Sequence, residues 1–283
     1  MSERNYNPTN SQTVLQVLIC TFGAEGINRV AEREHPHAAG VEYIVSWQLP
    51  DGDSPLPPDL ERPDFRIVKT NSRGLSRNRN NALSAATAPL CLISDDDVSY
   101  TANELETIIR SFADHPEADI ITFKYRSDEE HKFYPDASFN LRHPIKGYFT
   151  SSIEIAFRRD KVIDSGGRFK EDFGIGGRFM AGEENLFLHY LLRKGLNGIY
   201  IPKIIAYHPY LSTGEAQADN PDYIRTKGAV FIHLHPNTWP LRMLAHAVRH
   251  KSPEISRRHY LKQWLKGARQ AHELNKQSNH ESF

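Results

Sequence analysis

A series of short apolar runs in the first hundred residues constrains the fold more than any other feature of the sequence. Four runs, each four to seven residues long, end in polar or turn-forming residues and show no strict alternation of apolar and polar positions. This pattern is typical of strands in a parallel sheet that is covered on both faces. We therefore predict strands at residues 14–20, 41–46, 65–68 and 90–93.

Helical patterns separate the apolar runs. Strands that alternate with helices favour an α/β fold, in which flanking helices cover an open and mostly parallel sheet. The first predicted helix follows the third run, where Leu75, Ala82, Leu83 and Ala86 share one face. The later pattern predicts a helix at residues 103–114, strands at 120–124 and 153–157, and a helix at 182–195.

Polar or glycine residues follow each of the four strands. In an open parallel sheet, ligands bind at the carboxyl ends of the strands. One cleft is therefore expected to collect the residues that follow the strands: Thr21 and Phe22, Asp51 and Asp53, Arg73 and Gly74, and Asp95, Asp96 and Asp97.

The three consecutive aspartates, Asp95, Asp96 and Asp97, carry the strongest chemical signal. Adjacent carboxylates repel one another unless a cation or solvent relieves the repulsion. A hard divalent cation does so, and it prefers carboxylate and phosphate oxygens as ligands. The alternative is a helix N-cap cluster, because aspartate accepts hydrogen bonds from the first amides of a helix.

Bulk composition limits the classes of partner. The 283 residues include 35 Lys and Arg and 35 Asp and Glu, so the overall charge gives no argument for nucleic acid as a partner. No apolar run reaches the ~18 residues needed to span a bilayer, and the N-terminus lacks the apolar stretch of a secretory signal. A cytoplasmic protein is expected, with Cys20 and Cys91 as buried free thiols.

The order of several motifs resembles that of the family 2 glycosyltransferases, which have the GT-A fold. The shared features are a strand that ends in Thr and an aromatic residue, a segment with Gly, Arg and Asn, an Asp-x-Asp motif, an acidic pair after a glycine-rich loop, and a late His before a polar turn. Here they are Thr21–Phe22, Gly74–Asn80, Asp95–Asp97, Gly182–Asn185, and Tyr207–Pro209 with Ser212–Gly214. The resemblance covers roughly residues 14–235.

The resemblance implies a nucleotide-sugar donor site with Mn²⁺ or Mg²⁺. Asp97 would coordinate the metal, Asp95 would lie near the ribose or in the metal shell, and His208 would complete that shell. A solvated helix face is the alternative for Arg77 and Arg79, and a structural role is the alternative for His208. The full predicted set of donor-binding residues is Thr21, Phe22, Asp51, Asp53, Gly74, Arg77, Asn78, Asp95 and Asp96.

The acidic pair carries the implied catalytic base. By resemblance, Glu184 is the base and Glu183 holds hydroxyl groups of the sugar or the acceptor. A single displacement by an acceptor hydroxyl would invert the anomeric centre. The alternative is that both glutamates favour the first turn of a helix because of its dipole.

The end of the second strand departs from the family pattern. Many relatives have an Asp there that contacts the nucleobase, whereas this chain has Ser46-Trp47-Gln48. The nucleobase of the donor is therefore undefined, with UDP favoured over GDP. Trp47 either stacks on the base or is a buried structural residue. The glycines of residues 174–177 have two possible roles: they let the backbone approach the acceptor closely, or they form a simple turn.

The function predicted from the resemblance is metal-dependent sugar transfer to a carbohydrate or lipid-linked saccharide, in cell-surface polysaccharide or lipopolysaccharide synthesis. A nucleotidyltransferase is a weaker alternative, because it usually has a basic glycine-rich loop after the first strand, and residues 21–26 contain no Lys or Arg. A non-catalytic sugar- or nucleotide-binding module is the alternative from another functional class.

The chain is expected to divide into a disordered N-terminus at 1–12, a glycosyltransferase domain at 13–235 and a helical extension at 236–283. Residues 13–100 would form the donor half of the domain and residues 101–235 the acceptor half. Between Arg242 and Arg269 the sequence has eight Lys and Arg and only one acid, Glu254. Amphipathic basic helices there either contact the inner face of the cell membrane or pack on the domain or in a homodimer.

Overall fold

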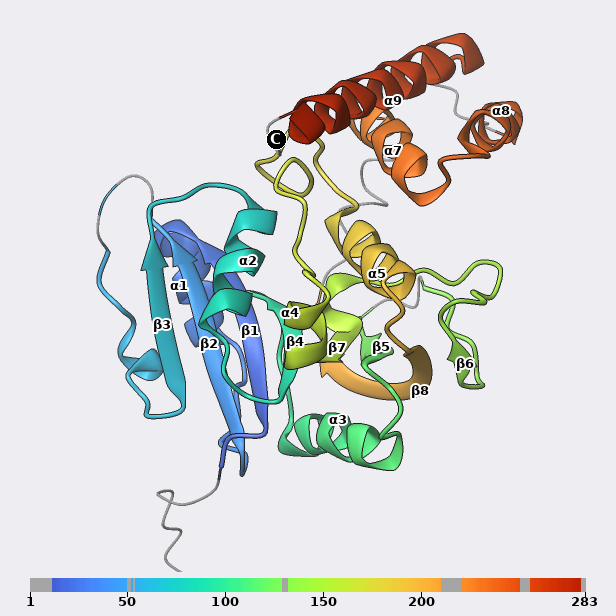
Figure 1. Cartoon of the computed structure of the whole chain (residues 1–283). Helices are drawn as coiled ribbons and strands as arrows, with labels where there is room; N and C mark the ends of the chain where they lie inside the picture. The colour runs from blue at the N-terminus through green and yellow to red at the C-terminus, as the bar shows by residue number, and fades with distance from the viewer. Residues whose placement is uncertain are drawn as a thin grey trace, which may run out of the picture. The chain divides into compact units, whose positions relative to one another are not determined.

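The computed structural model describes residues 12–49, 52, 54–128, 132–209, 220–249 and 255–280, with side chains described up to residue 274 (Figure 1). Of the N-terminal residues 1–12 that were predicted to be disordered, residues 1–11 lie outside these ranges. The chain forms two compact units. The sheet unit comprises Met1–Ser72, Asn78–Gly167 and Leu191–Pro209, and the helical unit comprises Arg73–Arg77, Arg168–Tyr190 and Tyr210–Phe283.

The sheet unit contains one mixed sheet. Within the described residues its order is β3-β2-β1-β4-β7-β5-β8-β6, and β7 and β6 run antiparallel to their neighbours. The predicted open, mostly parallel sheet is confirmed. Its strands are β1 (Leu15–Phe22), β2 (Val41–Gln48), β3 (Phe65–Thr70), β4 (Leu90–Asp95), β5 (Ile120–Arg126), β6 (Phe139–Asn140), β7 (Ile155–Arg158) and β8 (Gly198–Tyr207).

The register of the first strands brings their carboxyl ends to one edge. In β1, Cys20 lies opposite Ser46 of β2 and opposite Asp95 of β4. The residues that follow Cys20 and Asp95 therefore leave the sheet at the same level. Cys20 and Cys91 are both buried and free, as predicted, and burial raises the pKa of each thiol to about 12.

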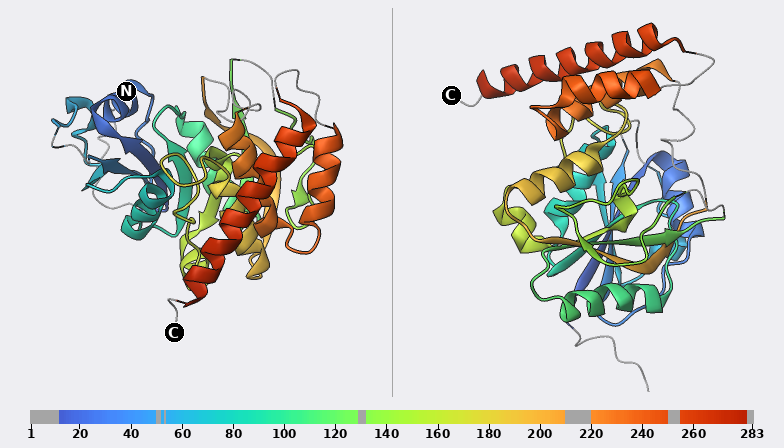
Figure 2. Two further views of the ribbon diagram at one scale, coloured as in Figure 1. Left: turned by 90° about the horizontal axis from the view of Figure 1, so that it is seen from above. Right: turned by 90° about the vertical axis from the view of Figure 1, so that its right-hand side faces the viewer.

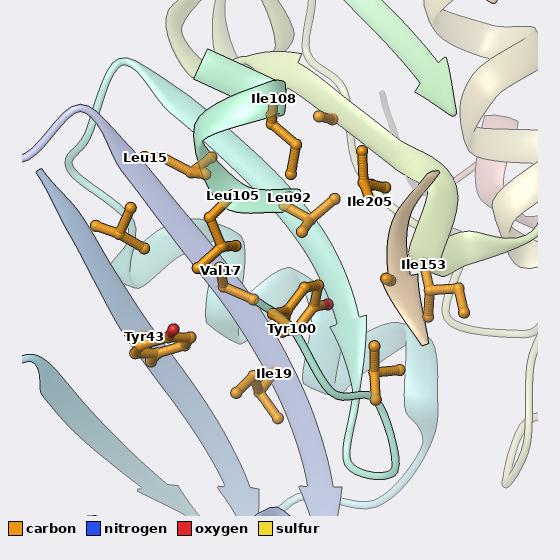
Figure 3. Packing of buried hydrophobic residues seen from close by; sticks show 14 of the residues in the cluster. Leu15, Val17, Ile19, Tyr43, Leu92, Tyr100, Leu105, Ile108, Ile153 and Ile205 are labelled. Carbon is orange, nitrogen blue, oxygen red and sulfur yellow. The ribbon is translucent and has the colours of Figure 1, made fainter. Parts of the chain in front are cut away.

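Helices flank the sheet and close its core. They are α1 (Gly23–Glu32), α2 (Leu75–Ala85), α3 (Ala102–Asp114) and α4 (Arg159–Asp164). Helix α3 begins with a capping box, in which the side chain of Thr101 accepts from the amide of Glu104 while the Glu104 carboxylate accepts from Thr101. Figure 3 shows side chains of β1, such as Val17, beside Leu92 of β4 and Leu105 and Ile108 of α3, all fully buried.

Strand β8 was not predicted, because Pro202 interrupts its apolar pattern. Proline lacks an amide donor and fits a sheet only at an edge or a bulge. The pairing of β8 with β5 shifts register around this point: Thr122 lies opposite Tyr200, whereas Lys124 lies opposite Ile204. The irregularity accommodates the proline, and the strand then continues to Tyr207.

The helical unit contains the first part of α5 (Glu183–Arg193) together with α7 (Pro221–Leu234), α8 (Trp239–Arg249) and α9 (Arg257–His280). Figure 2 shows α9 running alongside α7 in both views. Two glycines permit this close contact. A Cβ on Gly228 would lie 2.1 Å from the carbonyl oxygen of Trp264, and one on Gly267 would lie 1.8 Å from that of Arg225. Among the described residues, no helix is long and apolar enough to cross a membrane.

Candidate active site

Strand β4 ends in the aspartate triplet, and each of its three carboxylates has a different environment within the sheet unit. Asp96 is held most firmly. It accepts hydrogen bonds from Thr21 Oγ1 at 2.8 Å and from Arg29 Nε and Nη2 at 3.1 and 3.0 Å. Burial raises the pKa of Asp96, although the bonds from Arg29 and Thr21 act in the opposite direction. Both oxygens of Asp96 are therefore used in joining β1, α1 and the end of β4.

Asp95 forms an ion pair that was not expected from the sequence. Its Oδ1 accepts from Arg79 Nη2 at 2.8 Å, and its Oδ2 accepts from Ser152 Oγ at 3.1 Å. The side chain of Arg79 is only 3% exposed, so the solvated alternative considered for this residue is wrong. The paired Arg79 fixes the Asp95 carboxylate, whose side chain stays one-third exposed at 33%.

Asp97 is the member of the triplet that has a carboxylate oxygen available for a metal ion. Its Oδ1 is buried without an assigned hydrogen bond, and it lies at ion-pair distance, 3.3 Å, from His208 Nε2. The backbone amide of His208 is fixed by a 2.9 Å bond to the carbonyl of Arg126. Burial raises the pKa of Asp97, but the nearby His208 and Arg29 outweigh burial and leave the pKa below its ordinary value.

The Asp97–His208 pair fits a divalent cation that is shared with a substrate. A carboxylate oxygen and an imidazole nitrogen are suitable ligands, and the unpartnered Oδ1 supplies an unused acceptor. In the part of the chain that the structure describes, no group of three or more His, Cys, Asp or Glu is placed to hold a metal alone. Cations that bind phosphate substrates often take only one or two protein carboxylates and complete their shell with phosphate oxygens and water.

The remaining donor-side residues surround the end of β1. Asn78 is 2% exposed and donates to the carbonyl of Thr21 at 2.9 Å, whereas Phe22 is 45% exposed. Trp47 is fully buried and donates to the carbonyl of Gly23 at 2.8 Å, which favours the structural role considered for it over stacking on a base. The predicted donor residues Asp51 and Asp53 and the polar turn at residues 212–214 lie outside the described residues.

A buried cluster that the sequence analysis missed supports the contact of Ser152 with Asp95. Lys132 Nζ lies 2.7 Å from both carboxylate oxygens of Glu154 and donates to Ser151 Oγ at 2.9 Å. Tyr134 also donates to Glu154. The available signal was the Ser-x-x-Glu spacing at Ser151 and Glu154, which forms a capping box around a short 3₁₀ turn at Ser152–Glu154.

Gly74 and Arg77 belong to the helical unit. Gly74 has a φ of +104°, and a Cβ on Gly176 would lie 3.1 Å from the Cα of Gly74. Leu75 then donates its amide to the carbonyl of Ile175 at 2.8 Å. Arg77 Nε pairs with Glu171 Oε2 at 2.8 Å, and the Arg77 side chain is 50% exposed. The two glycines therefore bring the start of α2 against the glycine-rich loop.

The two glutamates at the start of α5 differ in accessibility. Glu183 is 5% exposed, and a Cβ on Gly174 would lie 3.2 Å from its carboxyl carbon. Glu184 is partly exposed and accepts a hydrogen bond from Asn185. The glycine at position 174, with a φ of +92°, thus leaves room for the Glu183 carboxylate, whereas Glu184 is less buried than Glu183.

Comparisons with known proteins indicate the fold and the class of enzyme. Residues 56–184 match the model of glycosyl transferase family 2. No curated protein sequence matches the chain significantly. TarS (residues 1–349) of S. aureus, solved in complex with UDP-GlcNAc, matches with a TM-score of 0.57 at 15% identity, over 90% of this chain and 79% of that chain. The structure of TarS (residues 1–349) in complex with UDP matches with a TM-score of 0.54 at 14% identity, over 85% of this chain and 76% of that chain.

A second enzyme gives a similar result. The mannosyltransferase PcManGT from Pyrobaculum calidifontis, solved in complex with GDP-Man and Mn²⁺, matches with a TM-score of 0.50 at 16% identity, over 93% of this chain and 74% of that chain. At these identities the structural matches establish the fold, and the family model supplies the sequence relation. The chain therefore has the fold of GT-A glycosyltransferases, and its residues 56–184 are similar to glycosyl transferase family 2.

Proposed function

We propose that this chain is a metal-dependent, inverting glycosyltransferase that moves a sugar from a nucleoside diphosphate onto an acceptor hydroxyl. The observation that carries the proposal is the unpartnered, buried Oδ1 of Asp97 with His208 Nε2 3.3 Å away, directly after β4. A cation at this position would stabilise the negative charge that the departing diphosphate accumulates. The family match to residues 56–184 supplies the reaction class.

Asp97 and His208 would hold Mn²⁺ or Mg²⁺ in this proposal. The chemistry that such a cation would supply is screening of the diphosphate and stabilisation of the charge on the leaving group. Asp95 is positioned by Arg79 and Ser152 to accept hydrogen bonds from the ribose or from water near the metal. Asp96 fixes the end of β4 through Arg29 and Thr21 and thereby helps to position Asp97.

The further donor-binding residues that we propose are Thr21, Phe22 and Asn78 in the sheet unit, and, from the family resemblance alone, Gly74 and Arg77 in the helical unit. The exposed ring of Phe22 is available to a ligand, and Asn78 fixes the carbonyl of Thr21. Arg77 is half exposed and offers a guanidinium whose planar fork suits phosphate oxygens. We favour a UDP-sugar as the donor because TarS was solved with UDP and with UDP-GlcNAc. GDP-sugars are the alternative donors, because PcManGT was solved with GDP-Man.

Glu184 is the proposed general base. It is partly exposed at the start of α5, whereas Glu183 is buried beneath Gly174. An accessible carboxylate can take the proton of an acceptor hydroxyl as that oxygen attacks the anomeric carbon. Glu183 is left to hold hydroxyl groups or to support the loop. Because one displacement occurs, the product has the inverted anomeric configuration.

The acceptor class follows from the family resemblance. We propose a carbohydrate or lipid-linked saccharide, in the synthesis of a cell-surface polysaccharide or lipopolysaccharide. The proposed place of reaction is the cytoplasmic side of the cell membrane. A nucleic acid partner is not part of the proposal, because Lys and Arg equal Asp and Glu at 35 each over the whole chain.

A donor screen by thermal unfolding tests the binding part of the proposal. A ligand at 100 times its Kd raises the free energy of unfolding by about 2.7 kcal/mol, which corresponds to a Tm increase on the order of 5 °C. We expect this increase with UDP-GlcNAc or another UDP-sugar in the presence of Mn²⁺, and little increase without the metal. Equal shifts with Mn²⁺ and with EDTA would contradict a metal-dependent donor site. A Tm increase with GDP-mannose alone would assign guanine, and not uracil, as the nucleobase of the donor.

A further inference from the structure

The two C-terminal helices differ in how their apolar faces are covered within the helical unit. In α9, Tyr260, Trp264, Ala268 and Ala271 are all at most 4% exposed. They belong to the side that packs on α7, where Gly228 and Gly267 allow close backbone contact. The apolar face of α9 is therefore used inside the protein, and only its basic side is exposed.

Helix α8 has an apolar face that remains exposed. Leu241, Leu244 and Val248 are 72%, 54% and 58% exposed. Their spacing of three and four residues places them on one side of the helix. Another part of α8 is anchored in the helical unit, where Ala247 is 2% exposed and belongs to a cluster with Trp264. The helix is thus fixed by one face while three large apolar side chains of the other face contact solvent.

The charges around this face have one sign. From residue 223 to residue 272 the sequence contains ten Lys and Arg and one acid, Glu254. Within the described part of this segment, the exposed charged side chains are Arg242, Arg249, Arg257, Arg258, Lys262, Lys266 and Arg269. Arg242 and Arg249 lie on α8 itself, and their spacing of seven residues places them on the same side of the helix. The surface of α8 therefore combines a row of exposed apolar side chains with basic side chains around it.

We propose that α8 is a docking helix for an anionic lipid surface, with Leu241, Leu244 and Val248 inserted among the lipids. A helix with one apolar face and basic flanks lies in a membrane interface and does not cross it. A second copy of the chain fits less well, because a two-fold contact through α8 would bring Arg242 and Arg249 towards the same positive charges of the partner. Anionic headgroups are complementary to those charges. Attachment is reversible and weakened by salt.

The docking proposal goes beyond the sugar-transfer reaction and does not depend on it. Membrane binding is measured on the full-length chain without donor or acceptor, by co-sedimentation with vesicles of phosphatidylglycerol and phosphatidylcholine in equal parts. We expect binding at low salt that falls as salt increases, and weaker binding to vesicles of phosphatidylcholine alone. Absence of sedimentation at low salt with the anionic vesicles would overturn the proposal.

Three variants test which residues are responsible. The combined variant L241S, L244S and V248S is expected to lower the bound fraction by about tenfold, because the inserting side chains are removed. The matched control, I145S, I163S and I204S, changes three other large side chains that are 40%, 44% and 39% exposed, and it should bind as the wild type does. The charge-reversal variant R242E and R249E should bind anionic vesicles less. Circular dichroism checks that each variant remains folded.

The outcomes separate a membrane surface from a self-association surface. Equal binding by the wild type and the L241S, L244S and V248S variant would overturn the role of α8. Sedimentation velocity without lipid measures the oligomeric state of both proteins. A dimer that is lost in this variant, together with no vesicle binding by the wild type, would assign the face to a second copy of the chain.

Discussion

Asp97→Ala is expected to reduce sugar transfer by at least about 10³-fold, because the proposed cation loses its carboxylate ligand. Loss of the charge stabilisation supplied by a bound metal is worth several kcal/mol in the transition state, and about 4 kcal/mol corresponds to a factor of about 10³ in rate. The fold should persist, since Asp97 Oδ1 makes no hydrogen bond that the structure depends on. Steady-state rates with saturating Mn²⁺ measure the effect.

One control variant and a second measurement on Asp97→Ala make this experiment specific. Asp114→Ala removes an exposed aspartate at the end of α3 and should leave both rate and donor binding unchanged. Donor binding by Asp97→Ala should no longer respond to Mn²⁺ in thermal unfolding. Wild-type rates for Asp97→Ala at saturating Mn²⁺ would show that the metal ligand has been assigned to the wrong residue.

Glu184→Gln is expected to lower the transfer rate by about 10² to 10⁴-fold, the usual contribution of a positioned general base. The substitution keeps the shape of the side chain and its ability to accept a hydrogen bond from Asn185, but it cannot take a proton. Donor affinity should stay close to that of the wild type, so the effect should be found in kcat and not in the donor KM.

The matched comparison is Glu183→Gln, in which the neighbouring buried glutamate is changed. Glu117→Gln, at an exposed position, controls for loss of a negative charge. If Glu183→Gln retains a normal fold and loses far more activity than Glu184→Gln, the roles of the two glutamates are exchanged. Thermal unfolding of each variant distinguishes this result from loss of the folded state.

The sheet was largely predictable because buried parallel strands leave a local signal. Each of the first four predicted runs became a strand, and each strand extends to or beyond the predicted carboxyl end. Strand β8 was missed because Pro202 weakens the local pattern, and only the register irregularity opposite β5 explains how that proline fits. A β-bulge depends on the neighbouring strand, which the sequence of one segment does not reveal.

The roles of the two arginines were harder to predict. Arg77 and Arg79 stand two residues apart on one helix and therefore point in different directions. The structure buries Arg79 against Asp95 and leaves Arg77 half exposed beside Glu171. The apolar face formed by Leu75, Ala82, Leu83 and Ala86 indicates which side of α2 is buried, but it does not indicate that an arginine on that side pairs with a carboxylate of β4.

For the C-terminal helices, too, the sequence did not show how the side chains pack. Residues 236–283 predicted basic, amphipathic helices, and α8 and α9 are both present. An apolar face in a sequence does not say what covers it. Trp264 is completely buried in the helical unit, whereas Leu241 is 72% exposed. This difference arises from the glycine-mediated contact of α7 with α9, which brings together residues about forty positions apart in the chain.

Release of nucleoside diphosphate shows whether the chain transfers a sugar in a metal-dependent reaction. The purified chain is incubated with a UDP-sugar and an acceptor saccharide, with Mn²⁺ or with EDTA, and the UDP formed is quantified along with the glycosylated product. We expect UDP and product in equal amounts with Mn²⁺, an inverted anomeric linkage, and loss of both with EDTA. Equal formation of UDP and product in EDTA, or a product with the retained configuration, would contradict a metal-dependent inverting transferase.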